Sequence, residues 1–161
     1  MGAVLSKCRN YRYTLSRNVD MFGEKVFAYF GVNPSTADET IDDQTVKKWI
    51  GFTAKNAGSS FVVGNVFAYR ATDVNELAKI EDPVGPDNDK YISMLIDQAD
   101  VLVPCWGARG KLPETMRDRL DEIMSLLKRS GKPVLCFGLT ASGDPKHPMM
   151  LSYETKLVPV D

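Results

Sequence analysis

The sequence predicts an α/β fold with three layers, α/β/α, around a central, mainly parallel four-stranded sheet and an N-terminal hairpin at the sheet edge. Two observations predict this fold. Four short runs of apolar, β-forming residues are typical of buried strands. Amphipathic helical segments lie between these runs, the alternation of a parallel sheet covered on both faces. A length of 161 residues suits one domain, residues 1–161.

The four strands are expected over residues 26–32, 60–67, 101–106 and 133–138, where hydrophobicity is nearly continuous. An earlier segment, residues 11–17, alternates polar and apolar side chains. That alternation predicts an edge strand. We expect it to pair with residues 20–29 across a turn near Gly23.

Three helices are expected over residues 43–56, 87–99 and 113–130, because apolar residues recur there at helical spacing. Gly131 and Pro133 are typical stop signals for the third helix.

The composition excludes several classes of protein. The formal net charge is −1, so the chain lacks the strongly basic surface typical of proteins that bind long nucleic acids. Three widely spaced cysteines without a Cys-x-x-Cys pair support neither a zinc site nor a disulfide framework. No P-loop or dinucleotide fingerprint occurs. We therefore expect no metal and no cofactor. Without a signal core or a long apolar run, we expect a cytoplasmic protein and no membrane partner.

Polar loops follow each predicted strand and define the expected site, because ligands of open parallel sheets bind beyond the carboxyl ends of the strands. The loops span residues 33–43, 65–73, 106–110 and 140–148. The candidate ligand-binding residues are Pro34, Ser35, Thr36, Asp42, Asn65, Tyr69, Arg70, Trp106, Gly107 and Lys146.

Asn33 and His147 are the principal catalytic candidates. The proline after Asn33 restricts the turn, so the Asn33 amide can donate and accept hydrogen bonds at a set place. The alternative is that Asn33 only caps the turn. His147 is the only histidine and lies between Pro145 and Pro148, a stiff setting for a group that titrates near neutral pH. The alternative is an exposed loop histidine without a role.

The other candidates each have two interpretations. Asp38, the third catalytic candidate, can act as a base or hold a metal, and so can Asp42 and Asp43. The alternative for Asp42 or Asp43 is to cap the following helix. Arg70 can hold a phosphate or carboxylate in a planar, bidentate contact, or pair with a neighbouring acid. Trp106 can stack on a base or belong to the core.

Several motifs are spread over nearly the whole chain: GVNPSTAD, DDQT, NVFAYRATD, VGPDND, WG and GDPKHPM. This set resembles a family of uncharacterised bacterial and viral proteins known by its Asn-Pro-Ser-Thr-Ala-Asp signature. The resemblance brings no activity with it, because that family is a domain of unknown function.

More distantly, the order of motifs is similar to that of the uracil-DNA glycosylase superfamily. Several of its branches carry Gly-x-Asn-Pro after the first core strand, which matches the segment around Asn33 here. Some carry an Asn-Val strand ending followed by an arginine, as at Asn65 and Arg70, and a late His-Pro pair, as at His147. The resemblance implies that Asn33 positions the attacking water and that His147 stabilises charge on the departing base. It also implies that an aromatic side chain stacks on the flipped base and that an asparagine reads its edge.

Two departures argue against duplex DNA as the target. Ser35 stands where glycosylase branches often have glycine, and residues 149–151 replace the serine-bearing loop that wedges the duplex. We therefore expect recognition of a nucleobase, a nucleotide or single-stranded nucleic acid, with hydrolysis of an N-glycosidic bond. The alternative is a non-catalytic module that sequesters a nucleotide or a modified base on the same scaffold. A third hypothesis is a protein-interaction surface, for which residues 149–151 are the only apolar hint.

Overall fold

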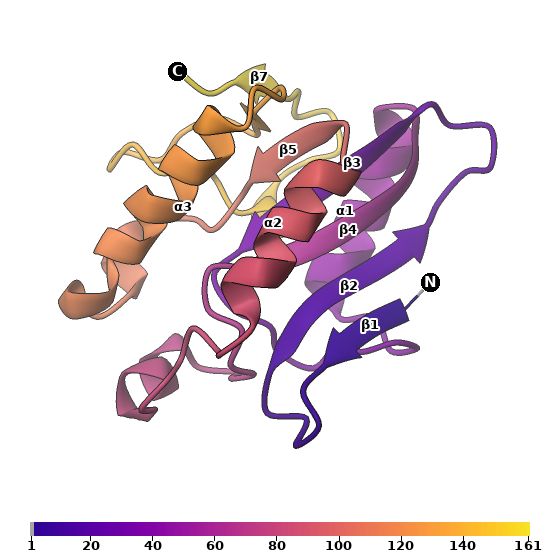
Figure 1. Ribbon diagram of the computed structural model, residues 1–161. Coiled ribbons are helices and arrows are strands. Elements are labelled where there is room, and N and C mark those ends of the chain that lie inside the picture. The colour runs from indigo at the N-terminus through magenta and orange to yellow at the C-terminus, as the bar shows by residue number, and fades with distance from the viewer. Residues whose placement is uncertain (1) are drawn as a thin grey trace.

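The computed structural model describes residues 2–161 and has a mixed five-stranded sheet at its centre (Figure 1). Its strands are β1 (Gly2–Leu5), β2 (Arg12–Asn18), β3 (Lys25–Gly31), β4 (Gly58–Asn65) and β5 (Val101–Pro104), in the spatial order β1-β2-β4-β3-β5. β3 pairs in parallel with β4 and β5, whereas β2 pairs antiparallel with β1 and β4. The prediction of an α/β fold is confirmed. The predicted parallel sheet of four strands is wrong, because the parallel part contains only three.

The fourth predicted strand, residues 133–138, shortens to β6 (Leu135–Cys136). β6 pairs antiparallel with β7 (Val158–Pro159), and a single parallel bridge between Leu102 and Val134 links it to β5. β6 therefore belongs to a separate two-stranded sheet with β7 and lies outside the five-stranded sheet.

The N-terminal edge hairpin consists of β1 and β2, and the predicted pairing of residues 11–17 with 20–29 is wrong. β4 lies between β2 and β3. The connection from β2 to β3 crosses the beginning of β4, where a Cβ on Gly23 would lie 2.4 Å from the carbonyl carbon of Gly58. The alternating pattern identified a strand, but consecutive strands in this chain are not neighbours in the sheet.

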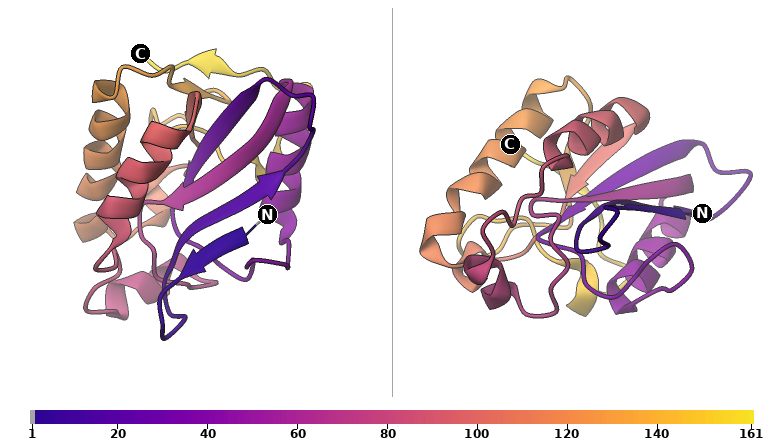
Figure 2. Two further views of the ribbon diagram at one scale, coloured as in Figure 1. Left: turned by 45° about the vertical axis from the view of Figure 1, so that its right-hand side comes forward. Right: turned by 60° about the horizontal axis from the view of Figure 1, so that its bottom comes forward.

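The three predicted helices are present: α1 (Gln44–Lys55), α2 (Asn88–Gln98) and α3 (Asp118–Arg129). Short 3₁₀ helices are η1 (Val74–Lys79), η2 (Arg109–Lys111), η3 (Glu114–Met116) and η4 (Pro148–Met150). Because η2 and η3 precede α3, that helix begins later than its sequence pattern predicts. α1 covers one face of the sheet, and α2 and α3 cover the other (Figure 2). None of the helices within residues 2–161 has the length and apolar character needed to cross a membrane.

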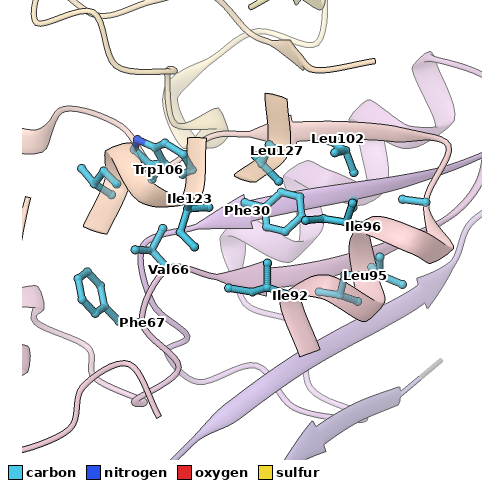
Figure 3. Close-up of a cluster of buried hydrophobic side chains, with 14 of the residues drawn as sticks. Phe30, Val66, Phe67, Ile92, Leu95, Ile96, Leu102, Trp106, Ile123 and Leu127 are labelled. Carbon is cyan, nitrogen blue, oxygen red and sulfur yellow. The ribbon is translucent and has the colours of Figure 1, made fainter. Parts of the chain in front are cut away.

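Each face of the sheet has its own buried cluster. On the α2 and α3 side, Phe30 lies among Leu95 and Ile123 (Figure 3). On the α1 side, the rings of Tyr29 and Trp49 stack with their centroids 5.5 Å apart. These clusters hold the sheet between the helices. Because β3, β4 and β5 run parallel, the loops that follow them leave the sheet at one rim.

Candidate functional site

A cavity of about 210 Å³ lies at this rim, lined by the loops after β3 and β4, the start of α1 and the C-terminal loop. The structure brings six of the sequence-predicted residues to its lining: Asn33, Pro34, Ser35, Asn65, Trp106 and His147. The segments around Asn33 and His147 lie far apart in the sequence but meet at this cavity.

Asp38 and Asp42 lie outside the cavity lining. The Asp38 carboxylate accepts hydrogen bonds from the amides of Thr40 and Ile41 at 2.9 and 2.8 Å, which lower its pKa. Asp42 accepts a hydrogen bond from Arg17 Nε at 2.7 Å. Both carboxylates hold the loop before α1 in shape, so their position gives no support to a role as the base.

Thr36 and Arg70 line a second hollow of about 320 Å³, which shares Ser35 with the cavity. Arg70 Nε is 3.4 Å from the Ser35 carbonyl, and within residues 2–161 this guanidinium forms no ion pair with a carboxylate. Tyr69 lies elsewhere, with its ring edge-on to Tyr11. The arginine is thus free to meet an anion beside the cavity rather than inside it.

Gly107 and Lys146, two of the predicted ligand-binding residues, are not on the lining of the cavity. The Gly107 amide donates to the Pro145 carbonyl at 2.8 Å. Its φ is +80°, and an added Cβ would lie 3.4 Å from the His147 Cβ, so glycine permits a close approach beneath the histidine. Lys146 is exposed, and its stem passes beside Gly138.

One end of the Asn33 side chain forms hydrogen bonds within the fold. Its Nδ2 donates to the carbonyls of Ala71 and Pro34 at 2.8 and 3.0 Å, which ties the loop after β3 to the loop after β4. Its Oδ1 has no hydrogen-bond partner within residues 2–161 and can accept a bond from a water or a ligand. Asn33 can therefore serve both roles, because Nδ2 holds the two loops together and Oδ1 is available to a ligand.

Asn65 lies at the end of β4 and is 2% exposed. Its Oδ1 would be 3.0 Å from a Cβ on Gly31, so the glycine leaves room for the amide. Asn88 on α2 fixes the backbone here by donating from Nδ2 to the Asn65 carbonyl at 2.9 Å. Asn65 Nδ2 is buried and has no partner within the described chain. An orphaned buried donor of this kind indicates a missing acceptor.

His147 is held in one tautomer. Its Nδ1 accepts a hydrogen bond from the Met149 amide at 3.2 Å at the start of η4. The proton of the neutral ring is therefore on Nε2. Burial lowers the pKa of His147, nearby Lys111 lowers it further, and Asp43 partly opposes the shift. At neutral pH the imidazole is thus a neutral donor on the lining of the cavity.

The stability of the protein should fall as the pH drops below about 6.5, the pKa of an unfolded histidine. The unfolded chain takes up the His147 proton first, because the pKa in the folded protein is lowered. Urea unfolding at pH 7.0 and pH 5.5 checks this: wild type should lose more free energy of unfolding than His147→Gln does. As the chain has one histidine, proton NMR reports its titration directly. A midpoint above 6.5 would contradict the expected direction.

Sequence reasoning missed several lining side chains, among them the hydrogen-bond donors Arg12, Trp49 and Lys111. Asp43, which the sequence offers as a base or a helix cap, also lines the cavity. Asp43 Oδ1 accepts from the Val46 amide at 2.9 Å and so caps α1, as one of the sequence alternatives has it. Its second oxygen has no hydrogen-bond partner within residues 2–161, and Asp43 is the only carboxylate on the lining.

Unpaired donors are concentrated at this cavity. Four lining residues carry a buried side-chain N–H without a partner in the described chain: Arg12, Trp49, Asn65 and Trp106. Trp106 is 3% exposed and also belongs to the core of Figure 3, so both of its predicted roles remain compatible with its position. In residues 2–161, no group of three or more His, Cys, Asp or Glu side chains is placed to hold a metal ion. The lining suits an uncharged or anionic ligand that is rich in acceptors.

The fold and site thus define an α/β protein with a donor-rich cavity at the carboxyl ends of its parallel strands. Residues 12–149 match the family described as a protein of unknown function (DUF1643), and the chain belongs to that family. This confirms the expectation of an uncharacterised family. No curated protein and no solved structure matches the chain.

Proposed function

We propose that this DUF1643 protein binds a nucleobase or nucleotide in the cavity and hydrolyses an N-glycosidic bond there. The observation that carries the proposal is the convergence of Asn65, the neutral His147 donor and the Asp43 carboxylate on one cavity. A base edge offers carbonyl oxygens and ring nitrogens, and these acceptors complement the orphaned donors of the lining. A volume of about 210 Å³ is too small for a dinucleotide.

We also propose that the fold is a three-layer α/β/α arrangement like that of the uracil-DNA glycosylase superfamily. Helices on both faces of the sheet support it. So does the order in which the loops supply Asn33, Asn65 and His147 to the rim.

In the proposed reaction, a water oxygen forms a bond to C1′ of the sugar while the glycosidic C–N bond breaks. The base leaves with the electron pair, and His147 Nε2–H donates to the oxygen that gains negative charge. The free Asp43 oxygen takes the proton from the water, a role for which the sequence offers Asp38, Asp42 and Asp43. Asn33 Oδ1 orients that water by accepting its second proton as a hydrogen bond.

Base release from nucleosides, nucleotides and single-stranded oligonucleotides, followed by chromatography, tests the proposal. Asp43→Asn should lower the rate by about 10²–10⁴-fold, since asparagine cannot take the proton. Its folding should be unchanged, because asparagine caps a helix as well as aspartate does. His147→Gln should lower the rate by about 10²–10³-fold. Glu39→Gln, which removes an exposed carboxylate of the same loop, should retain full activity.

The outcomes separate the two candidate functions. Base release that persists in both Asp43→Asn and His147→Gln overturns the catalytic assignment. Tight nucleotide binding without release of the base supports the non-catalytic module that sequesters its ligand. The two hydrogen bonds from Asn33 Nδ2 to backbone carbonyls favour this alternative. Absence of binding to any nucleobase, nucleoside or nucleotide overturns both functions.

A further inference from the structure

Arg12, at the start of β2, is a buried arginine that the fold leaves largely unsatisfied. It is 3% exposed and lines the cavity. Its Nη1 donates to the Ala37 carbonyl at 2.8 Å, and this is its one side-chain hydrogen bond within residues 2–161. Its Nε is buried without a partner. No carboxylate of the described chain lies within ion-pair distance of it.

Arg17, on the same strand, shows what a structural arginine looks like here. It is 2% exposed, as buried as Arg12. Its Nε pairs with Asp42, and its two terminal nitrogens donate to the carbonyls of Gly2, Ser16, Asp38 and Ile41. The fold can therefore satisfy a buried guanidinium fully on β2, and it does not do so at Arg12.

Arg12 stays charged at neutral pH. Burial lowers its pKa to about 10, which still leaves the guanidinium protonated at pH 7. Asp43 attracts it from beyond ion-pair distance, whereas Arg70 and Arg17 repel it. A buried charge without a paired anion is costly. Such a group is expected where a ligand supplies the missing partner.

The other polar groups of the lining are mostly hydrogen-bond donors, which favours a ligand that offers acceptors. Asn65 Nδ2, His147 Nε2–H and the Lys111 ammonium are all donors, and Asp43 is the one carboxylate of the lining. We propose that Arg12 is an anion-binding residue of the cavity and that, resting on the proposed function, the ligand is a nucleoside monophosphate whose phosphate lies on Arg12. Guanidinium and phosphate match in planar, charge-assisted hydrogen bonds, which the free Nε and Nη2 can provide.

Calorimetric titration with nucleoside 5′-monophosphates, the matching nucleosides and inorganic phosphate tests this inference. Wild type should bind the cognate monophosphate at least tenfold more tightly than its nucleoside. Arg12→Gln should weaken monophosphate binding by about 10- to 100-fold and leave the nucleoside unaffected. Arg129→Gln, which removes one positive charge from the end of α3, should keep the wild-type ratio. Arg12→Lys retains the charge without the planar fork and should lie between the two, which guards against a glutamine variant that fails to fold.

Failure of this inference and failure of the proposed function look different. Equal binding of nucleoside and monophosphate by wild type, or an unchanged ratio in Arg12→Gln, overturns the anion site and leaves the base pocket standing. Equal binding of inorganic phosphate and all monophosphates supports the anion site and overturns base recognition. No binding of any of these probes overturns both.

Discussion

Replacing Arg17 with methionine is expected to lower the free energy of unfolding by about 3–5 kcal/mol, whereas Arg12→Met should change it by less than about 1 kcal/mol. The two arginines lie on one strand and are equally buried. Methionine fills a comparable volume and carries no charge, so the pair of variants compares the two charges in nearly the same setting.

The difference follows from what each guanidinium contacts. Loss of Arg17 removes the donor to the Asp42 carboxylate and the hydrogen bonds to four backbone carbonyls. Two of these carbonyls, those of Asp38 and Ile41, belong to the loop before α1. Loss of Arg12 removes one hydrogen bond to Ala37, but it also removes a desolvated charge that has no counterion. The two effects of the Arg12 substitution oppose each other, so the net change is small.

Urea denaturation of both variants and wild type, without added ligand, measures this contrast. Equal slopes with denaturant would show that the variants unfold from comparable native states. If Arg12→Met were as damaging as Arg17→Met, Arg12 would be a structural residue and its proposed contact with an anion would lose its basis.

The second large effect is expected at Asp144, whose side chain is 2% exposed. It accepts hydrogen bonds from the Arg109 amide at 2.8 Å, from Arg109 Nε at 3.0 Å and from the Ser142 hydroxyl at 2.7 Å. Asp144→Ala should cost about 2–3 kcal/mol, because these donors lose a charged, buried acceptor. The loop that carries His147 should loosen as well, and the single imidazole signal in the NMR spectrum should shift or broaden.

Asp121 provides the matched control for Asp144. It binds the same guanidinium, with Arg109 Nη2 2.8 Å from its Oδ1, but its side chain is 63% exposed. Asp121→Ala should therefore cost less than about 1 kcal/mol and leave the imidazole signal in place. Comparable losses in the two variants would show that burial does not set the strength of this network.

Much of the architecture could be predicted from local patterns. The apolar runs identified β3, β4 and β5, and helical spacing identified α1, α2 and α3. The order of strands could not be predicted, because an alternating pattern shows that a segment is a strand and not which strand lies beside it. The placement of β4 between β2 and β3 rests on tertiary contacts such as the packing of Gly23 on Gly58.

The same error explains why Arg12 was missed. In an edge strand, an arginine between two tyrosines is expected to face water. Here β2 is an inner strand, and Arg12 reaches under the loop after β3, as its bond to the Ala37 carbonyl shows. Asn33, Asn65 and His147 were found because each follows a recognisable strand, and the rim rule for parallel sheets then places them together. The sequence indicates that Asp43 caps α1, which accounts for its Oδ1. The sequence does not show that its second oxygen faces the cavity.

The antiparallel strand β2 joins the sheet only through β1 and β4, yet it supplies the buried cation of the cavity. For a ligand bound to Arg12, as proposed above, occupancy of the cavity and attachment of the N-terminal hairpin would be linked equilibria. A ligand that requires Arg12 binds only while β2 is paired, and by mass action a hundredfold excess over its Kd adds about 2.7 kcal/mol to the native state. The site would thus be complete only while the hairpin of β1 and β2 is paired with β4, and a ligand on Arg12 would stabilise that pairing.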